Sequence, residues 1–293
     1  EKTKDGIEKV TKADVQRVAQ KYLQPDKVRI LVVGNDKDFD EALSVLGEVN
    51  EIDVTITMPG MSSDTPPASE DDMAQGKALF ERSIEAAGGR DAFKAVQEIR
   101  QKGTVLIVTP QGEIGLDIEI LVSLPNKMRV TSQTPMGEIV QILNGDQAWM
   151  ITPMGTQPGP PSVKTSMMEN IWQNLAFLYG QAETEGLTTQ HIGQEDVEDK
   201  TTEILLITPP GFTGFKLYLD TATMLPVKKV ARAMSPQGPM EIEDMLSDYR
   251  EVAGMMLPFK STTKRNGQPG GEVTIGEIEI NPTLAEELFT VPE

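Results

Sequence analysis

The sequence predicts an α+β protein whose main body is an open, curved antiparallel sheet or barrel with one inserted helix. Three observations lead to this prediction. Short apolar runs separated by turn residues follow one another from Ile99 to Ile280, which is typical of an antiparallel meander. A helical pattern over 167–180 interrupts the series. A stretch without hydrophobic period and with three prolines, 59–73, divides this body from a first segment of different texture.

Composition excludes several classes of function. The 293 residues carry 45 acidic and 27 basic side chains, a net charge of −18, which disfavours nucleic acid and anionic membrane surfaces. Cysteine is absent and His191 is the only histidine, so a zinc site or a serine triad lacks its usual residues. We therefore expect no enzyme, metal or cofactor in this chain. No apolar run reaches the length of a membrane-spanning helix, so an integral membrane protein is not expected.

The first segment, 1–58, reads as a small α/β piece with a well-marked helix start. Thr11 and Asp14 are spaced as in a capping box, although Asp replaces the usual Glu or Gln, and Val10 and Val15 are placed for a hydrophobic staple. The expected elements are a helix ending at Pro25, a strand over 28–33, a short helix over 40–46, and a strand or extended tail over 49–58.

One long motif in this segment resembles a known family. Residues 10–35 read VTKADVQRVAQKYLQPDKVRILVVGN, and this wording is similar to the C-terminal end of an insulinase-like (pitrilysin-type) zinc peptidase domain. The resemblance implies that 1–58 is a fragment of such a metallopeptidase domain and that 59–73 is a linker. The family's H-x-x-E-H motif is missing from this chain, so zinc and the catalytic residues would belong to a region upstream. A free-standing α/β appendage is the alternative.

The body, 74–293, begins with helices over 74–87 and 91–96, the first ended by Gly88 and Gly89. We expect a mobile connection over 155–162, a solvated charged turn around 195–199, and a final short helix over 284–288. Glu241, Glu243 and Asp244 are expected on the wet face of their strand, as are Glu277 and Glu279. The predicted strands are 104–108, 114–122, 128–130, 138–143, 148–151, 202–207, 215–219, 227–233, 240–249, 259–264 and 271–280.

Three motifs of the body carry a second resemblance. They are LDTATMLP at 219–226, DYREVAG at 248–254 followed by LPF, and the closing NP and FTVP within 281–292. Together with the order of elements, they are similar to the superfamily of periplasmic lipoprotein carriers and outer-membrane lipoprotein-sorting receptors. This resemblance implies a curved antiparallel half-barrel closed by a lid helix over a cavity for lipid acyl chains. It also implies a periplasmic or cell-envelope location, with an export signal upstream of Glu1.

A curved sheet that does not close leaves a concave apolar face, which either a helix or a ligand must cover. The helix at 167–180 is the expected lid, and its large apolar side chains either contact a ligand or pack as ordinary core. Trp149, just after a tight turn, has the same two interpretations. His191 is expected to be a solvent-facing or satisfied histidine. The candidate ligand-binding residues are Met168, Ile171, Trp172, Leu175, Phe177 and Trp149.

The leading functional prediction is a non-catalytic envelope domain that binds a lipid, a lipoprotein acyl chain or another apolar ligand. It would be fused behind a zinc peptidase. The alternative is an accessory scaffold that holds a protein substrate or partner of that peptidase and has no lipid cargo. The two differ in the interior: a cavity of several hundred Å³ indicates a ligand, and a filled core indicates a scaffold.

Overall fold

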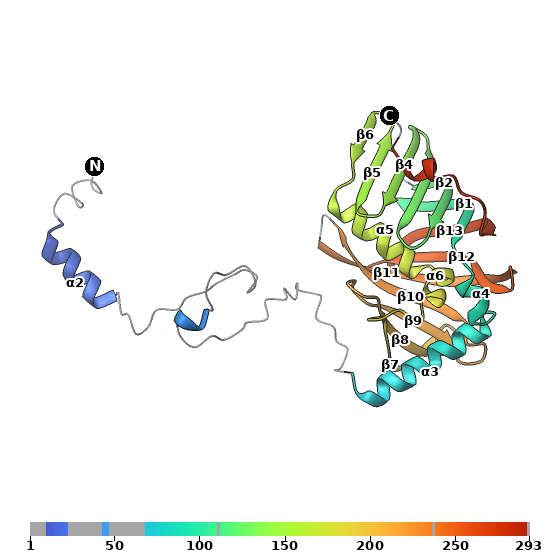
Figure 1. The fold of residues 1–293 in the computed structure, drawn as a ribbon, viewed down its shortest axis with the longest axis horizontal. Helices are drawn as coiled ribbons and strands as arrows, with labels where there is room; N and C mark the ends of the chain where they lie inside the picture. Colours follow the sequence, from blue (N-terminus) through green and yellow to red (C-terminus); the bar gives the residue numbers. More distant parts are fainter. Residues whose placement is uncertain (1–9, 23–42, 47–67, 110–111, 236–237, 292–293) are drawn as a thin grey trace. The chain divides into compact units, whose positions relative to one another are not determined.

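A computed structural model describes residues 10–22, 43–46, 68–109, 112–235 and 238–291 (Figure 1). The chain divides into two units, Glu1–Ile56 and Thr57–Glu293, and each is described by itself below.

The first unit contains the predicted capped helix, α2 (Lys12–Tyr22). The Asp14 backbone N–H donates to Thr11 Oγ1, and the Thr11 N–H donates to an Asp14 carboxylate oxygen, both at 3.2 Å. This is the reciprocal capping box expected from the sequence. The predicted helix over 40–46 appears as the 3-10 helix η3 (Leu43–Leu46). The strands expected at 28–33 and 49–58 lie outside the described residues.

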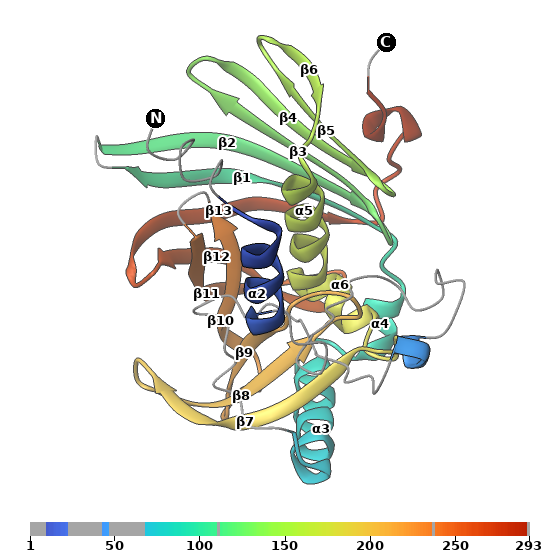
Figure 2. The ribbon, with the colours of Figure 1, turned by 90° about the vertical axis from the view of Figure 1, so that its left-hand side faces the viewer.

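The second unit is one antiparallel sheet of thirteen described strands, in the order β6-β5-β4-β3-β2-β1-β13-β12-β11-β10-β9-β8-β7. The sheet is strongly curved and remains open between its edge strands β6 and β7 (Figure 2). The strands are β1 (Glu98–Thr109), β2 (Gly112–Ser123), β3 (Lys127–Thr134), β4 (Gly137–Asn144), β5 (Gln147–Thr152), β6 (Gly155–Pro158), β7 (Thr188–Val197), β8 (Lys200–Thr208), β9 (Phe215–Asp220), β10 (Pro226–Ser235), β11 (Gly238–Val252), β12 (Met255–Arg265) and β13 (Gln268–Ile280).

This strand order explains why helices lie inside the curve. Hairpins join consecutive strands within each half of the sheet, and the two halves meet where β1 pairs with β13. Only the connection from β6 to β7 must pass from one edge of the sheet to the other. That connection contains α5 (Pro161–Gln173) and α6 (Leu175–Gly180), which lie against the concave side in Figure 2. The fold is thus the half-barrel with an inserted lid that the sequence predicts.

The lid differs from the single helix predicted over 167–180. It begins earlier, with Pro161 in the first turn, where a missing N–H costs nothing. It breaks at Asn174, whose backbone is extended (φ −74°, ψ 121°). The Ala176 N–H donates to Asn174 Oδ1 at 3.0 Å, so the Asn174 side chain ends one helix and caps the next.

Three other expectations for the body are wrong, wholly or in part. Within the connection expected to be mobile at 155–162, Gly155–Pro158 forms strand β6. Residues 70–73, assigned above to the linker, form the first turn of α3 (Glu70–Ala86), which Ser69 caps with a second capping box. The solvated charged turn expected at 195–199 is confined to the exposed residues 198–199, because 195–197 belong to β7, an edge strand whose position tolerates a polar sequence. The closing helix, η4 (Glu286–Phe289), is a 3-10 turn.

The main core joins helices α3, α4 (Arg90–Lys94) and α6 to the sheet. Its centre is Tyr179, whose ring meets Phe80 and Phe93 edge to face at centroid distances of 5.4 and 5.1 Å. The Tyr179 hydroxyl lies 2.5 Å from Ser83 Oγ. Both groups are almost completely buried, so this hydrogen bond ties α6 to α3 inside the apolar core.

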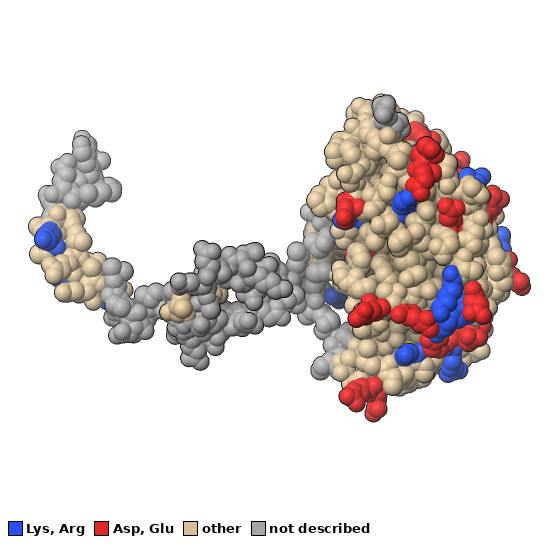
Figure 3. All heavy atoms as spheres, viewed as in Figure 1, with Lys and Arg blue, Asp and Glu red and all other residues tan. Residues whose placement is uncertain are grey.

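The convex face of the sheet carries charged side chains in pairs. Acidic and basic groups also lie side by side over α3 and α4, as comparison of Figure 3 with Figure 1 shows. Arg100 lies 3.3 Å from both Glu119 and Glu279, and Lys228 lies 3.3 Å from Glu243. The wet-face prediction for Glu277, Glu279, Glu241 and Glu243 agrees with this arrangement. It is wrong for Asp244, which the two-residue period of a strand places on the opposite, concave face.

Candidate functional site

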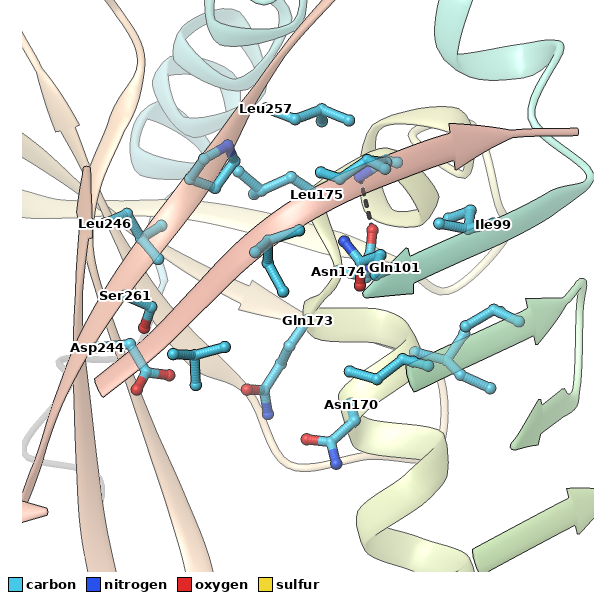
Figure 4. A pocket seen from close by; sticks show the side chains of 18 of the residues that line it. Ile99, Gln101, Asn170, Gln173, Asn174, Leu175, Asp244, Leu246, Leu257 and Ser261 are labelled. Carbon is cyan, nitrogen blue, oxygen red and sulfur yellow. Dashed lines mark hydrogen bonds between the residues drawn. The ribbon is translucent and has the colours of Figure 1, made fainter. Parts of the chain in front are cut away.

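A cavity of about 310 Å³ lies between the concave face of the sheet and the junction of α5 and α6 (Figure 4). Strands from both halves of the sheet contribute to its wall, so the pairing of β1 with β13 brings the two sets of side chains together. Most of the wall is apolar. Its main apolar side chains are Ile99, Val122, Ile171, Leu175, Leu257 and Ile275.

A bulge in β13 determines which side chains enter the cavity. Lys102 pairs with Glu277 and Gly103 pairs with Ile275, so Gly276 is the extra residue. This extra residue lets Ile275 and Ile278, three apart, both line the cavity. Gly103 is required beside the bulge, because a Cβ there would lie 2.2 Å from the Thr274 carbonyl oxygen. Bulge and glycine together bend the sheet around the apolar wall.

One end of the cavity is polar. Lys229 Nζ lies 3.2 Å from Asp244 Oδ2, and each side chain is only 16% exposed. The Thr263 hydroxyl donates to the other oxygen, Asp244 Oδ1, at 2.6 Å. Ser261, two residues before Thr263 on the same strand, also lines this end. A partly buried ion pair with a supporting hydroxyl therefore borders a mostly apolar wall.

The roof of the cavity is formed by the last turn of α5 and the start of α6. It presents the carboxamides of Asn170, Gln173 and Asn174 beside the apolar Ile171 and Leu175. In Figure 4, the labelled Asn170 and Gln173 side chains reach from the roof helix, while the dashed line marks the cap made by Asn174. The break between the helices thus gives the roof both apolar and hydrogen-bonding groups.

Of the six predicted ligand-binding residues, the structure brings two into the cavity wall, Ile171 and Leu175. Trp172 and Phe177 are buried against each other, with ring centroids 4.8 Å apart at 64°. They belong to the main core and not to the cavity wall. Their placement agrees with the alternative interpretation as packing residues.

The remaining two predicted residues lie beside the core. Met168 is partly buried against it, and Trp149 on β5 is half-buried opposite Pro158 of β6. Neither contributes to the cavity wall. Contact between a ligand and any of the six predicted residues stays a prediction.

The polar end was missed from the sequence. Asp244 was grouped with Glu241 and Glu243, although the period of two along EIED places it on the other face. That period is the signal that identifies it. The same period of two places Lys229 on the concave face, because its neighbour Lys228 pairs with Glu243 on the convex face. The partnership of Lys229 with Asp244 depends on the register of β10 and β11, for which the sequence holds no direct signal.

The only histidine lies away from the cavity wall. His191 Nε2 is 2.7 Å from Glu203 Oε2 across the β7–β8 pair, as expected for a satisfied histidine. Among the described residues, no group of three His, Cys, Asp or Glu side chains is arranged to hold a metal ion. The H-x-x-E-H motif of the peptidase family named above is missing from the sequence.

The helices of the second unit are short, with 17 residues in α3. Across the described parts of the chain, no helix has both the length and the apolar character needed to cross a membrane.

Comparisons with known proteins bear on the fold. No protein-family model and no curated protein sequence matches this chain. Among solved structures, a LolA superfamily protein from Nitrosomonas europaea matches with a TM-score of 0.51 and 15% identity, over 74% of this chain and 97% of its own. A DUF1329 family protein from Desulfovibrio piger matches with a TM-score of 0.51 and 13% identity, over 73% and 97%. At these identities the likeness shows the fold alone: an open, curved half-barrel with a lid.

Proposed function

We propose that residues 74–293 form a binding domain that holds the chain of a lipid, a lipoprotein acyl chain or another apolar molecule between the sheet and the α5–α6 lid. The observation that carries this proposal is the cavity of about 310 Å³ with its mostly apolar wall. A filled interior would have favoured the scaffold alternative. The cavity lies at the small end of the range of roughly 300–1,000 Å³ that is usual for ligand sites, which suits one chain better than a large multi-chain lipid.

Burial of apolar surface would supply the binding free energy. Each methylene group moved from water into such a site contributes about 0.8 kcal/mol. The side chains that meet the ligand would be Ile99, Val122, Leu257, Ile275 and Ile278, which come from several strands and need little movement to receive it. The motifs at 219–226 and 248–254, which resemble periplasmic lipoprotein carriers, support an acyl chain as the cargo and the bacterial envelope as the location.

We also propose that residues 1–58 are the C-terminal piece of a zinc-peptidase-like domain and that the region around 59–69 tethers it to the binding domain. The wording of residues 10–35 and the capped helix Lys12–Tyr22 support this. The hydrolytic residues would then lie upstream. We expect an H-x-x-E-H motif in the coding sequence that precedes Glu1. Its absence would refute the proposal that the segment belongs to an active zinc peptidase.

The binding proposal is tested with protein from which bound lipid has been removed. The neutral fluorescent probe N-phenyl-1-naphthylamine is titrated into the wild type and two variants of β13. Val273→Phe places a ring in the cavity wall, whereas Thr274→Phe places it on the exposed, opposite face. Loss of room for even two methylene groups corresponds to about 1.6 kcal/mol, so Val273→Phe should weaken binding by about tenfold.

Thr274→Phe should bind the probe as the wild type does. If the wild type shows no fluorescence change and no thermal stabilisation with any lipid, detergent or probe, the scaffold alternative replaces the binding proposal. Equal binding by both variants would place the probe somewhere other than this cavity.

A further inference from the structure

We infer that the ligand of this cavity is amphipathic and that its head is an uncharged, hydrogen-bonding group seated on the Lys229–Asp244 pair. The inference rests on the proposed function and adds the chemical class of the ligand. It starts from the position of the pair: two charged side chains, each 16% exposed and 3.2 Å apart, border a cavity whose wall is otherwise mostly apolar.

The pair has hydrogen-bonding capacity left for a ligand. An ammonium group has three donors and a carboxylate has about four acceptor positions. Among the described residues, Asp244 receives the Lys229 ammonium and the Thr263 hydroxyl on different oxygens. A hydroxyl or amide head could therefore accept from Lys229 and donate to Asp244 at the same time. A head without hydrogen-bonding groups would leave this capacity unmet in a partly desolvated place.

The strand register orients such a ligand. Asp244 pairs with Thr263 near the β12–β13 turn, two residues before β12 ends at Arg265. Leu257 lies toward the other end of the same strand, and Ile99 pairs with Ile280 at that far end. Figure 4 shows the same separation, with Asp244 and Ser261 on one side of the cavity and Ile99 on the other. The head would lie at the turn side and the chain would run toward Ile99.

The charge of the pair selects the class of head. Lys229 and Asp244 together are neutral, so an anionic head attracted to one is repelled by the other at a similar distance, and a cationic head meets the reverse. An uncharged head avoids both penalties. Removing one partner should therefore not simply weaken binding but change the preferred charge of the ligand.

The test is a displacement series with three ten-carbon ligands of different head charge: 1-decanol, decanoate and decyltrimethylammonium. Each competes with N-phenyl-1-naphthylamine at pH 8. The wild type should prefer decanol over both ions. Lys229→Met leaves Asp244 alone and should shift the preference toward the ammonium ligand, and Asp244→Asn should shift it toward decanoate. Each shift should be about tenfold, because the remaining partly buried charge attracts a head of opposite charge and repels one of like charge.

The convex face offers matched controls. Lys228 and Glu243 are neighbours of the pair on the same two strands, lie 3.3 Å apart and face away from the cavity. Lys228→Met and Glu243→Gln change the net charge of the chain by the same amounts, so they report any general effect of charge. Neither should change the order of the three ligands. The double variant K229M/D244M, in which apolar groups replace the pair, should fold and lose the preference for decanol.

The outcomes separate this inference from the proposed function. Opposite shifts in the two cavity variants, absent from the two controls, support the inference. The inference fails if the three ligands keep one order of affinity in the wild type and all variants, or if the wild type prefers an ionic ligand. In either case the proposed function stands, because the cavity still binds alkyl chains. If none of the three displaces the probe from any form, the inference and the proposed function fail together.

Discussion

The buried hydrogen bond between Ser83 and Tyr179 should hold the lid to α3 with a measurable coupling energy. Ser83 is 0% exposed and Tyr179 is 1% exposed, and their oxygens are 2.5 Å apart. Tyr179→Phe keeps the ring contacts with Phe80 and Phe93 but leaves Ser83 without this partner. Ser83→Ala leaves the tyrosine hydroxyl buried without one. An unsatisfied buried polar group costs about 1–3 kcal/mol, so we expect each single variant to lose that much stability.

The double variant distinguishes this mechanism from general loss of packing. Removing both polar groups leaves neither unsatisfied, so the double variant should lose clearly less than the sum of the two single losses, by about 1 kcal/mol or more. The assay is urea unfolding followed by circular dichroism, with thermal midpoints as a second readout; about 2–4 °C per kcal/mol is usual for a domain of this size. Additive losses within error would refute the reasoning.

The same residue predicts a pH dependence. Burial raises the pKa of the Tyr179 hydroxyl, and the hydrogen bond with Ser83 only partly offsets this. The folded state therefore keeps the proton after the unfolded chain, with an ordinary tyrosine pKa of about 10, has lost it. The resulting stabilisation is fully present below about pH 10 and is lost as pH rises further. Tyr179→Phe should unfold less steeply with alkali than the wild type, and an unchanged slope would contradict the assignment.

Three further predictions concern the lid and its neighbours. Gly76→Ala should destabilise the domain although alanine favours a helix, because the new Cβ would lie 2.3 Å from the Thr189 carbonyl oxygen. Gly115→Ala is the control, since nothing lies within 4 Å of the Cβ added there. Equal unfolding midpoints for the two variants would refute the packing argument. Asn174→Ala removes the cap of α6 and should cost about 1 kcal/mol in urea unfolding, and no loss would refute the cap. Burial raises the pKa of Glu169, so its neutral form favours the folded state. That contribution is complete below its unfolded pKa of about 4.3 and is lost as pH rises through the folded pKa. Glu169→Gln should therefore exceed the wild type in stability near pH 7 and match it at acid pH; a constant difference would point to another cause.

Local signals identified most of the elements. Thr11 with Asp14 marks a helix start, Gly88 and Gly89 mark the end of α3, and Asn144-Gly145-Asp146 marks the turn between β4 and β5. These motifs act through the backbone of a few adjacent residues, so tertiary context leaves them unchanged. The alternating strands follow for the same reason, because one buried face imposes its period on the sequence.

Features that depend on contacts distant in the chain could not be read in this way. The polar sequence of β7 forms a strand because β8 pairs with it and α3 packs on it. The break of the lid at Asn174 is an exception, because its cap is local, but the apolar pattern over 167–180 favours a continuous helix. The Lys229–Asp244 pair requires the register of β10 on β11. Trp172 and Phe177 are plausible ligand contacts by size, but they meet edge to face within the main core.

Protection of a cavity residue by ligand tests the central claim most directly. The chain has no cysteine, so Ile275→Cys in the cavity wall and Thr274→Cys on the exposed face each introduce one unique thiol. The rate of reaction with methyl methanethiosulfonate is measured with and without 1-decanol. If the alkyl chain of decanol occupies the cavity, a ligand concentration about ten times Kd should lower the reaction rate of the Ile275→Cys thiol by about tenfold. The reaction rate of the Thr274→Cys thiol should stay unchanged. Equal rates at Ile275→Cys with and without a bound ligand would contradict the account.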